Sequence, residues 1–455
     1  MKKVNYIFFF ILTTISVLIF FSLFKFLNIN YLGFKFYYLK YFLLFVLLFI
    51  ISFFFKKKKI FYIIYLFSLL LPIYSFEILL NIKSFENFVF DNRSRLEIYH
   101  QTELKDKSVT ISGINFLDDN TLDILPLAGV SNIYTIFCNE NGYFNNYVSD
   151  RYGFNNPDKN WNTKKKVTFL VGDSFVHGAC VKEDFTRILN KKLDKIFLNL
   201  GMGGNGPLLN QATLQEYIKV KKPDSVLYFH YEGNDFNGLN REKDHFLLKQ
   251  YLDINFSQGL KNRQNEINLI AKNDISKRYY QKLLKSQKIE KISKIRNIIV
   301  LTKFRKYFFD KYFPSQKIEN KTEALSRNNR YLIQLNDYRN ISNRQKKSLT
   351  LMSDIFENFK GMAKLHNFKL YFIYIPAYDR FKLSEQFPDK INSFDFLNKK
   401  KLLKIVERKE IPIIDLTNFI KVNNYKDLYP FGLSGHFNQK GYNLISDFII
   451  SKTNR

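Results

Sequence analysis

The sequence Val167-Thr-Phe-Leu-Val-Gly-Asp-Ser-Phe175 carries the strongest indication of the fold. Its first five residues are a short run of β-branched and apolar side chains, which indicates a buried strand. The run ends at Gly172, and the amphipathic segment Asp184–Leu193 follows a few residues later. This succession predicts a strand, a tight turn and a helix, which is the unit of an α/β fold.

The same succession continues toward the C-terminus. Further apolar strands are predicted at Ile196–Leu200, Ser225–Tyr231, Lys369–Ile375 and Ile411–Leu416, and helices at Pro207–Val220, Leu351–His366, Lys399–Arg408 and Gly441–Ser451. Five apolar strands separated by helices predict a parallel sheet that is covered on both faces. Ligands of such sheets bind beyond the carboxyl ends of the strands.

Residues that can carry chemistry stand at those strand ends. The clusters are Gly172–Phe175, Asn199–Gly206 and Glu232–Asp235, each after a predicted strand, and Gly435–Asn438 before the last helix. Because the carboxyl ends of parallel strands lie at one edge of a sheet, we expect these clusters to meet there.

The four clusters, in this order, resemble those of the SGNH (GDSL-type) hydrolases, a family named for a Ser, a Gly, an Asn and a His in four separated blocks. The resemblance covers roughly residues 167–240 and 351–455. It implies a flavodoxin-like three-layer αβα hydrolase domain. No metal or nucleotide site is visible in the sequence, so no cofactor is expected.

The resemblance also implies a role for each matching residue. Ser174 is the expected nucleophile and His436 the expected base. The oxyanion hole is assigned to the backbone N–H groups of Ser174 and Gly204 and to the side-chain amide of Asn234. The residue types suit these roles, because a serine hydroxyl needs a base and a glycine lets the backbone approach a substrate closely.

Each of these residues also has a structural interpretation. A serine in such a turn is often only a helix cap, and a lone histidine is often structural. His177, three residues after Ser174, would lie on the helix that leaves the turn, and His230 is expected in the core of a buried strand. Asp173 and Asp235 are expected to hold turns by bonding to the backbone.

One position departs from the family pattern. Family members usually carry an Asp three residues before the histidine, and this chain has Leu433 there. Neutralising the acid of a Ser-His-Asp triad lowers the rate about 10⁴-fold. Three alternatives follow: a substitute group such as Asp427, Asp415, Ser434 or a backbone carbonyl holds the ring, a Ser–His dyad suffices, or the protein does not hydrolyse.

The segment around His436, PFGLSGHFNQKGY at 430–442, is similar to that of a membrane-anchored bacterial subgroup that also lacks this acid. Cys138-Asn-Glu140, Ser149–Pro157 and Trp161 resemble the lead-in of the same proteins. This resemblance implies that residues 81–166 pack against the hydrolase domain.

The two cysteines, Cys138 and Cys180, each lie near the expected site. Because the domain that carries both cysteines is expected to lie outside the cytoplasm, they are expected to form a disulfide. The alternative is two buried free thiols. Two cysteines in 455 residues exclude a disulfide-dense scaffold and most cysteine-ligated metal clusters.

The first 80 residues are predicted to be a membrane anchor. Val4–Phe24, Tyr41–Phe55 and Ile60–Leu80 are apolar runs, and the first is long and has no cleavage site, which argues against a signal peptide. Six lysines flank one side of these spans and three the other. The positive-inside rule then places everything after Leu80 outside the cytoplasm, on the inner (cytoplasmic) membrane.

The net charge of +29 is concentrated in two segments. Nine Lys against one Glu give residues 1–80 a net charge of +8, and 26 basic against 10 acidic residues give the predicted insertion at about 241–350 a net charge of +16. Within it, residues 289–309 have the spacing of a basic amphipathic helix, which either lies on an anionic membrane or covers the domain with a solvated face. Nucleic acid is not an expected partner, since no reader motif is present.

These observations predict a membrane-anchored extracytoplasmic esterase or O-acyltransferase. It would act on ester-linked acyl groups, with acetyl expected, of a cell-surface glycan or glycolipid, through an acyl-enzyme on Ser174. A transferase would need a separate membrane-bound acyltransferase as a partner. The alternatives are a lipase or lysophospholipase at the bilayer, and a non-catalytic glycan-binding or assembly protein.

Overall fold

The computed structural model describes residues 71–72, 74–79, 95–103, 109–111, 117, 122–275, 343–386 and 397–453. The chain divides into two compact units. Met1–Asn92 with Tyr280–Asn336 form one unit, in which the described residues, 71–72 and 74–79, are helical. Arg93–Tyr279 with Asp337–Arg455 form the other, which holds both described sheets.

The larger unit is built on a five-stranded parallel sheet. Its strands are β4 (Val167–Val171), β5 (Ile196–Asn199), β6 (Ser225–Tyr231), β7 (Lys369–Ile375) and β8 (Ile413–Asp415). They lie in the order β5-β4-β6-β7-β8, and every neighbouring pair is parallel. The predicted α/β fold with a parallel sheet is therefore confirmed, and this order is that of flavodoxin-like sheets.

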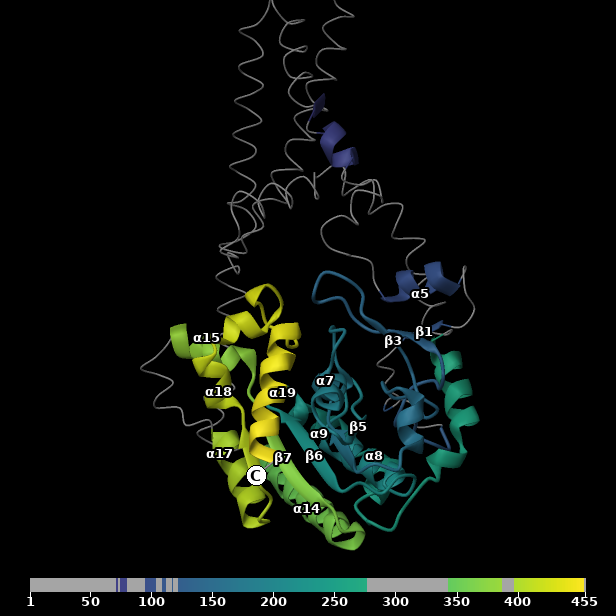
Figure 1. Cartoon of the computed structure of the whole chain (residues 1–455), viewed down its shortest axis with the longest axis vertical. Helices are drawn as coiled ribbons and strands as arrows, with labels where there is room; N and C mark the ends of the chain where they lie inside the picture. Colours follow the sequence, from purple (N-terminus) through teal and green to yellow (C-terminus); the bar gives the residue numbers. More distant parts are fainter. Residues whose placement is uncertain are drawn as a thin grey trace, which may run out of the picture. The chain divides into compact units, whose positions relative to one another are not determined.

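Helices cover both faces of the sheet (Figure 1). One face packs on α8 (Pro207–Tyr217), α14 (Asn343–His366) and α17 (Leu397–Arg408), and the other on α7 (Phe185–Lys192), α18 (Thr417–Val422) and α19 (Gln439–Thr453). Successive side chains of β4 point to opposite faces of the sheet. Phe169 packs with the first group of helices and Leu170 with the second, and both are fully buried. Burial on both faces explains why the strands are almost continuously apolar.

The order of the strands fixes where a site can form. The chain runs from β4 outward to β5 and then returns to β6 on the other side of β4. The loops that leave β4 and β6 therefore run in opposite directions, and in such sheets ligands bind at this switch point, beyond the carboxyl ends of the strands. Three of the four predicted clusters follow β4, β5 and β6.

A second, smaller sheet precedes the parallel one. It contains β1 (Val109–Ile111), β2 (Tyr134–Ile136) and β3 (Asn146–Val148), with α5 (Arg95–Glu103) before it. β1 and β2 are parallel, and β2 and β3 are antiparallel. We call residues 134–148 the hairpin; it lies within the predicted lead-in and carries Cys138 and Glu140.

The beginning of the predicted insertion is part of the larger unit's core. Residues 241–275 contain the end of α9 (Asp235–Glu242), α10 (Phe246–Gln250), the 3-10 turn η2 (Leu260–Asn262) and a helix at 264–275. Their apolar side chains join the same core as α8. Residues 276–342, including the predicted amphipathic helix at 289–309, lie outside the described residues.

The predicted membrane spans also lie largely outside the described residues. Val4–Phe24 and Tyr41–Phe55 are not described, and Ile60–Leu80 is described only at 71–72 and 74–79. Among the residues that the structure does describe, no helix combines the length and the apolar character that crossing a membrane requires.

Candidate active site

Ser174 stands where β4 turns into a short helix. α6 (Ser174–His177) begins directly after Asp173, whose Oδ1 accepts the backbone N–H of Phe175 at 2.9 Å and caps the helix. A side chain at Gly172 would meet Val176 Cγ2 at 2.6 Å, so the tight turn requires glycine there. The turn leaves the Ser174 side chain half-buried at the carboxyl edge of the sheet.

His436 reaches the same place from the other end of the sequence. It lies between the 3-10 turn η4 (Pro430–Gly432) and α19, and its ring packs against Phe175 with centroids 4.9 Å apart. Its Nε2 lies 2.7 Å from Ser174 Oγ. The structure thus brings the predicted nucleophile and the predicted base within hydrogen-bond distance.

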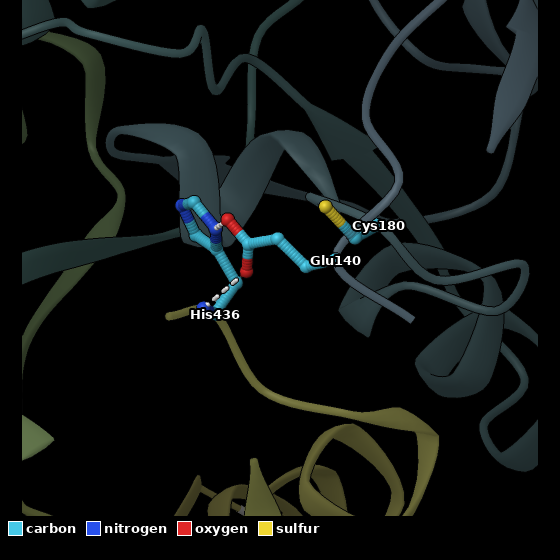
Figure 2. Close-up of side chains that lie close together, drawn as sticks. All are labelled: Glu140, Cys180 and His436. Atoms are coloured by element: carbon cyan, nitrogen blue, oxygen red, sulfur yellow. Dashed lines mark hydrogen bonds and ion pairs between the residues drawn. The ribbon is translucent and has the colours of Figure 1, made fainter. Parts of the chain in front are cut away.

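Glu140 of the hairpin completes the arrangement. Its Oε1 lies 2.8 Å from His436 Nδ1, and its Oε2 accepts the backbone N–H of His436 at 2.7 Å (Figure 2). A side chain at Gly435 would meet Glu140 Oε2 at 2.6 Å, so the glycine before His436 makes room for the carboxylate. Burial opposes ionisation of Glu140, but the hydrogen bonds and charge of His436 outweigh it and lower the carboxyl pKa.

These contacts define the direction of each hydrogen bond. An ionised Glu140 can only accept, so His436 Nδ1 carries a proton and donates it to Oε1. His436 Nε2 is then free to accept the hydroxyl proton of Ser174. A serine hydroxyl, an imidazole and a carboxylate linked in this sense can pass a proton from Ser174 Oγ to His436.

The two other predicted oxyanion residues lie in the loops that follow β5 and β6. Gly204 is in a turn closed by a hydrogen bond from Asn205 N–H to Met202 O, and nothing lies within 4 Å of where its side chain would be. Asn234 is exposed at the start of α9, and its side chain hydrogen-bonds to Asp173. Burial, with the nearby Asp235, raises the Asp173 pKa to about 6. The oxyanion roles of both residues stay predictions.

The remaining histidines near the strands are buried. His177 is fully buried, with Nε2 2.7 Å from Tyr147 Oη, and its pKa is lowered to about 3, mainly by burial. His177 is therefore neutral, and its two ring nitrogens bind Tyr147 Oη and the Gly203 N–H. His230 is fully buried in β6, and its Nδ1 lies 3.0 Å from Asp235 Oδ2.

The acids and the hydroxyl considered as substitutes for the missing Asp have other surroundings. Asp415 pairs with Lys399 at 2.6 Å, and Asp427 lies 3.3 Å from Lys440 Nζ. Ser434 is exposed to solvent. The carboxylate that contacts His436 comes instead from the lead-in, at Glu140, a residue that the sequence did not predict for the site.

A disulfide docks the hairpin onto the serine segment. Cys138 and Cys180 are joined, with their Cα atoms 5.0 Å apart. Asn141 Nδ2 also donates to Cys180 O at 2.6 Å, and Asn145 Nδ2 to Val181 O at 2.5 Å. The signal that could have located Glu140 was therefore present: it lies two residues after Cys138, whose expected partner is six residues after Ser174.

Glu140, Cys180 and His436 also form the kind of cluster that can hold a metal, with candidate ligand atoms within 4.8 Å of one another (Figure 2). The chemistry of this set does not fit an ion. The Cys180 sulfur is bonded to Cys138, so no thiolate is available, and Glu140 and His436 Nδ1 already bind each other. The cluster fits an oriented histidine better than a metal centre.

Fold and site together define an α/β protein with a Ser–His–Glu arrangement at the carboxyl edge of a parallel sheet. No protein-family model and no curated protein sequence matches the chain. Among solved structures it is similar to a lipase/acylhydrolase from Enterococcus faecalis, with 14% identity and a TM-score of 0.30, over 63% of this chain and 94% of that one.

Proposed function

We propose that this chain is a serine-dependent esterase or O-acyltransferase, with Ser174 as nucleophile, His436 as base and Glu140 as the acid that orients the base. One observation carries the proposal: the continuous line of hydrogen bonds from Ser174 Oγ through both ring nitrogens of His436 to Glu140 Oε1, at 2.7 and 2.8 Å. Each group has the type and spacing that nucleophilic acyl transfer needs.

In the first half of the reaction, Ser174 Oγ attacks the ester carbonyl carbon while its proton moves to His436 Nε2. Glu140 stabilises the imidazolium that results. Negative charge develops on the carbonyl oxygen. In this proposal, the N–H groups of Ser174 and Gly204 and the side-chain amide of Asn234 stabilise it by donating hydrogen bonds. As the C–O bond breaks, His436 returns the proton to the leaving alcohol, and an acyl-serine remains.

In the second half, an acceptor hydroxyl gives its proton to His436 Nε2 and attacks the acyl-serine. Breaking the bond to Ser174 Oγ returns that proton to the serine. Water as the acceptor completes hydrolysis, and a sugar hydroxyl completes transfer. The same groups serve both outcomes, so the site supports acyl transfer without selecting the acceptor.

The place of action in this proposal is the extracytoplasmic side of the inner membrane. The predicted spans and their flanking lysines support this orientation. A disulfide between the only two cysteines is typical of an oxidising compartment. The substrate proposed for that location is a cell-surface glycan or glycolipid that carries ester-linked acyl groups, with acetyl expected. If the reaction is a transfer, a membrane-bound acyltransferase is the expected donor partner.

The non-catalytic alternative rested on the missing acid at Leu433. Glu140 occupies the place of that acid against His436 Nδ1, so the main reason for expecting an inactive site is gone. The lipase alternative differs from the proposal only in substrate and is separated from it by experiment.

Labelling with a fluorophosphonate probe tests the chemistry. The full-length protein in detergent should be labelled, and Ser174→Ala should not be labelled. Ser434→Ala is the matched control, because Ser434 is an exposed serine close to His436 in sequence, and it should label like the wild type. If the wild type is not labelled while its circular dichroism and thermal transition show a folded protein, the proposal is wrong.

A substrate series tests the class of ester. An aryl acetate, an O-acetylated polysaccharide and a lysophospholipid are compared at equal enzyme concentration. We expect turnover of the first two and little of the third. Preferential turnover of the lysophospholipid would favour the lipase alternative.

A further inference from the structure

The turn that carries Gly204 is tied to the serine segment at its start. Met202 N–H donates to Gly172 O at 3.2 Å, and Asn205 N–H closes the turn onto Met202 O at 3.1 Å. The peptide between Gly203 and Gly204 lies at the centre of this turn. Its orientation is not fixed by either of these two bonds.

That orientation decides where the N–H of Gly204 points. Gly204 is the third residue of the turn and has a φ of +91°, which is the signature of a type II turn. Type I and type II turns differ mainly by a flip of the central peptide. The flip reverses the direction of the Gly204 N–H, which is the predicted oxyanion donor.

His177 holds the residue next to this peptide. Its Nδ1 lies 3.1 Å from Gly203 N, whose N–H donates to it. Because a backbone N–H can only donate, Nδ1 carries no proton, and the ring proton is on Nε2, which faces Tyr147 Oη at 2.7 Å. The ring also packs on Phe137, with centroids 4.1 Å apart.

The surroundings keep this tautomer. His177 is fully buried, and burial lowers its pKa to about 3, so the ring stays neutral at the pH where an esterase would act. The turn is also close to the nucleophile: a side chain at Gly203 would lie 3.8 Å from Ser174 Cβ. His177 therefore joins the serine helix, the glycine turn and the hairpin at one point.

We infer that His177 is a positioning residue for the oxyanion hole: by accepting the Gly203 N–H, it holds the first peptide of the glycine turn against the serine helix, and so sets the position of the Gly204 N–H relative to Ser174. His177 itself does not touch the substrate. The inference rests on the proposed acyl-transfer function, because only that function creates an oxyanion at this place.

Two matched variants separate the two sides of the ring. In His177→Asn, the side-chain amide can lie near the position of Nδ1 and keep an acceptor for Gly203. In His177→Gln, the amide can lie near the position of Nε2 and keep a partner for Tyr147 only. Both variants remove the ring, so they share its loss of packing.

The expected kinetic result is a split between the two variants. Losing one oxyanion donor lowers kcat about 10²–10³-fold. We expect this loss in His177→Gln with KM for an aryl acetate nearly unchanged, whereas His177→Asn should stay within about tenfold of the wild type. Equal kcat values for the two variants, or a loss confined to KM, would overturn the inference.

Amide hydrogen exchange measures the turn without using activity. In the wild type, the Gly203 amide should be protected although it lies in a glycine-rich surface turn, and the protection should survive in His177→Asn but not in His177→Gln. Rapid exchange of Gly203 in the wild type contradicts the inference even if neither variant folds. A protected turn in a wild type that no fluorophosphonate labels would instead refute the proposed function and leave the turn geometry intact.

Discussion

The parallel sheet and the hairpin supply one site by different physical means. Ser174, Gly204 and Asn234 follow the neighbouring strands β4, β5 and β6, so the hydrogen-bonded register of the sheet places them together. Glu140 comes from a hairpin whose strands are three residues each, and a disulfide and side-chain hydrogen bonds attach it. The nucleophile is thus placed by the core and the acid by docking.

The strands of the parallel sheet and those of the hairpin differ in how deeply they are buried. All five residues of β4 are buried, whereas Tyr134 and Val148, which face each other across the hairpin, are exposed. The buried apolar side chains of the hairpin form only a small cluster, Phe137 and Tyr147 with Ala179 and Cys180, so the disulfide and a few hydrogen bonds carry much of its attachment. The acid is therefore the member of the site that can be disturbed while the sheet remains folded, and each prediction below acts on that difference.

The largest effect is expected from the acid itself. Glu140→Gln keeps the shape of the side chain but lets its amide donate to His436, which favours the wrong tautomer, and kcat/KM for an aryl acetate should fall about 10³–10⁴-fold. Asp427→Asn is the control, because Asp427 lies beside Lys440 and should leave the rate within about twofold. A Glu140→Gln enzyme within tenfold of the wild type would mean that Ser174 and His436 suffice.

The same difference explains what the sequence could predict. Strands 167–171, 225–231 and 369–375 are found at the predicted residues, because strands buried on both faces are continuously apolar and bounded by polar turns. Once the order of strands and helices is known, Ser174 and Asn234 must lie at one edge. The local sequence clusters, together with the usual topology of parallel α/β sheets, are enough to predict that Ser174 and His436 lie close together.

The position of the acid, Glu140, could not be predicted from the order of strands and helices. Glu140 is 296 residues from His436 and follows no strand of the parallel sheet. The segment Cys138-Asn-Glu140 resembles the lead-in of a subgroup but indicates no role in the site, and the place of Glu140 depends on the pairing of Cys138 with Cys180. Only by combining that pairing with the serine motif could the sequence have pointed to it.

A smaller effect is expected at the contact between sheet and hairpin. In Gly435→Ala, the added methyl would lie 2.6 Å from Glu140 Oε2 and push the carboxylate away from His436. A displacement of about 1 Å costs on the order of 10²-fold in rate, so kcat should fall by about that factor. Gly361→Ala is the matched control, since its methyl would lie 3.9 Å from the nearest atom, Ile254 Cδ1, and its rate should not change.

Removing the disulfide tests the attachment of the hairpin. The bond closes a separation of 42 residues, and the Cys138→Ser, Cys180→Ser double variant should lose about 2–5 kcal/mol of unfolding free energy in urea. Its kcat should fall about tenfold, because a loosened Glu140 orients His436 less well. A dithiol reductant should lower the wild-type rate similarly and leave the double variant unaffected; an equal response of both would refute the link between the disulfide and the acid.

An effect on stability alone is expected from protonating the buried histidine between sheet and hairpin. The pKa of His177 is lowered to about 3 in the fold, against an ordinary value of 6.5. Between these pH values the unfolded chain binds a proton that the folded chain excludes, so acid favours unfolding. The stability that comes from neutral His177 is lost as pH falls from about 6.5 to 3.

The unfolding free energy of the wild type should therefore approach that of His177→Gln as pH falls through this window, by at most about 1.4 kcal/mol per pH unit. Other buried carboxyls, such as Asp150, whose pKa burial raises to about 6, titrate in both proteins and cancel in the comparison. Because His177 also contacts Tyr147 of β3, the hairpin should lose its amide protection in acid before the parallel sheet does; simultaneous loss would mean that the two regions unfold as one unit.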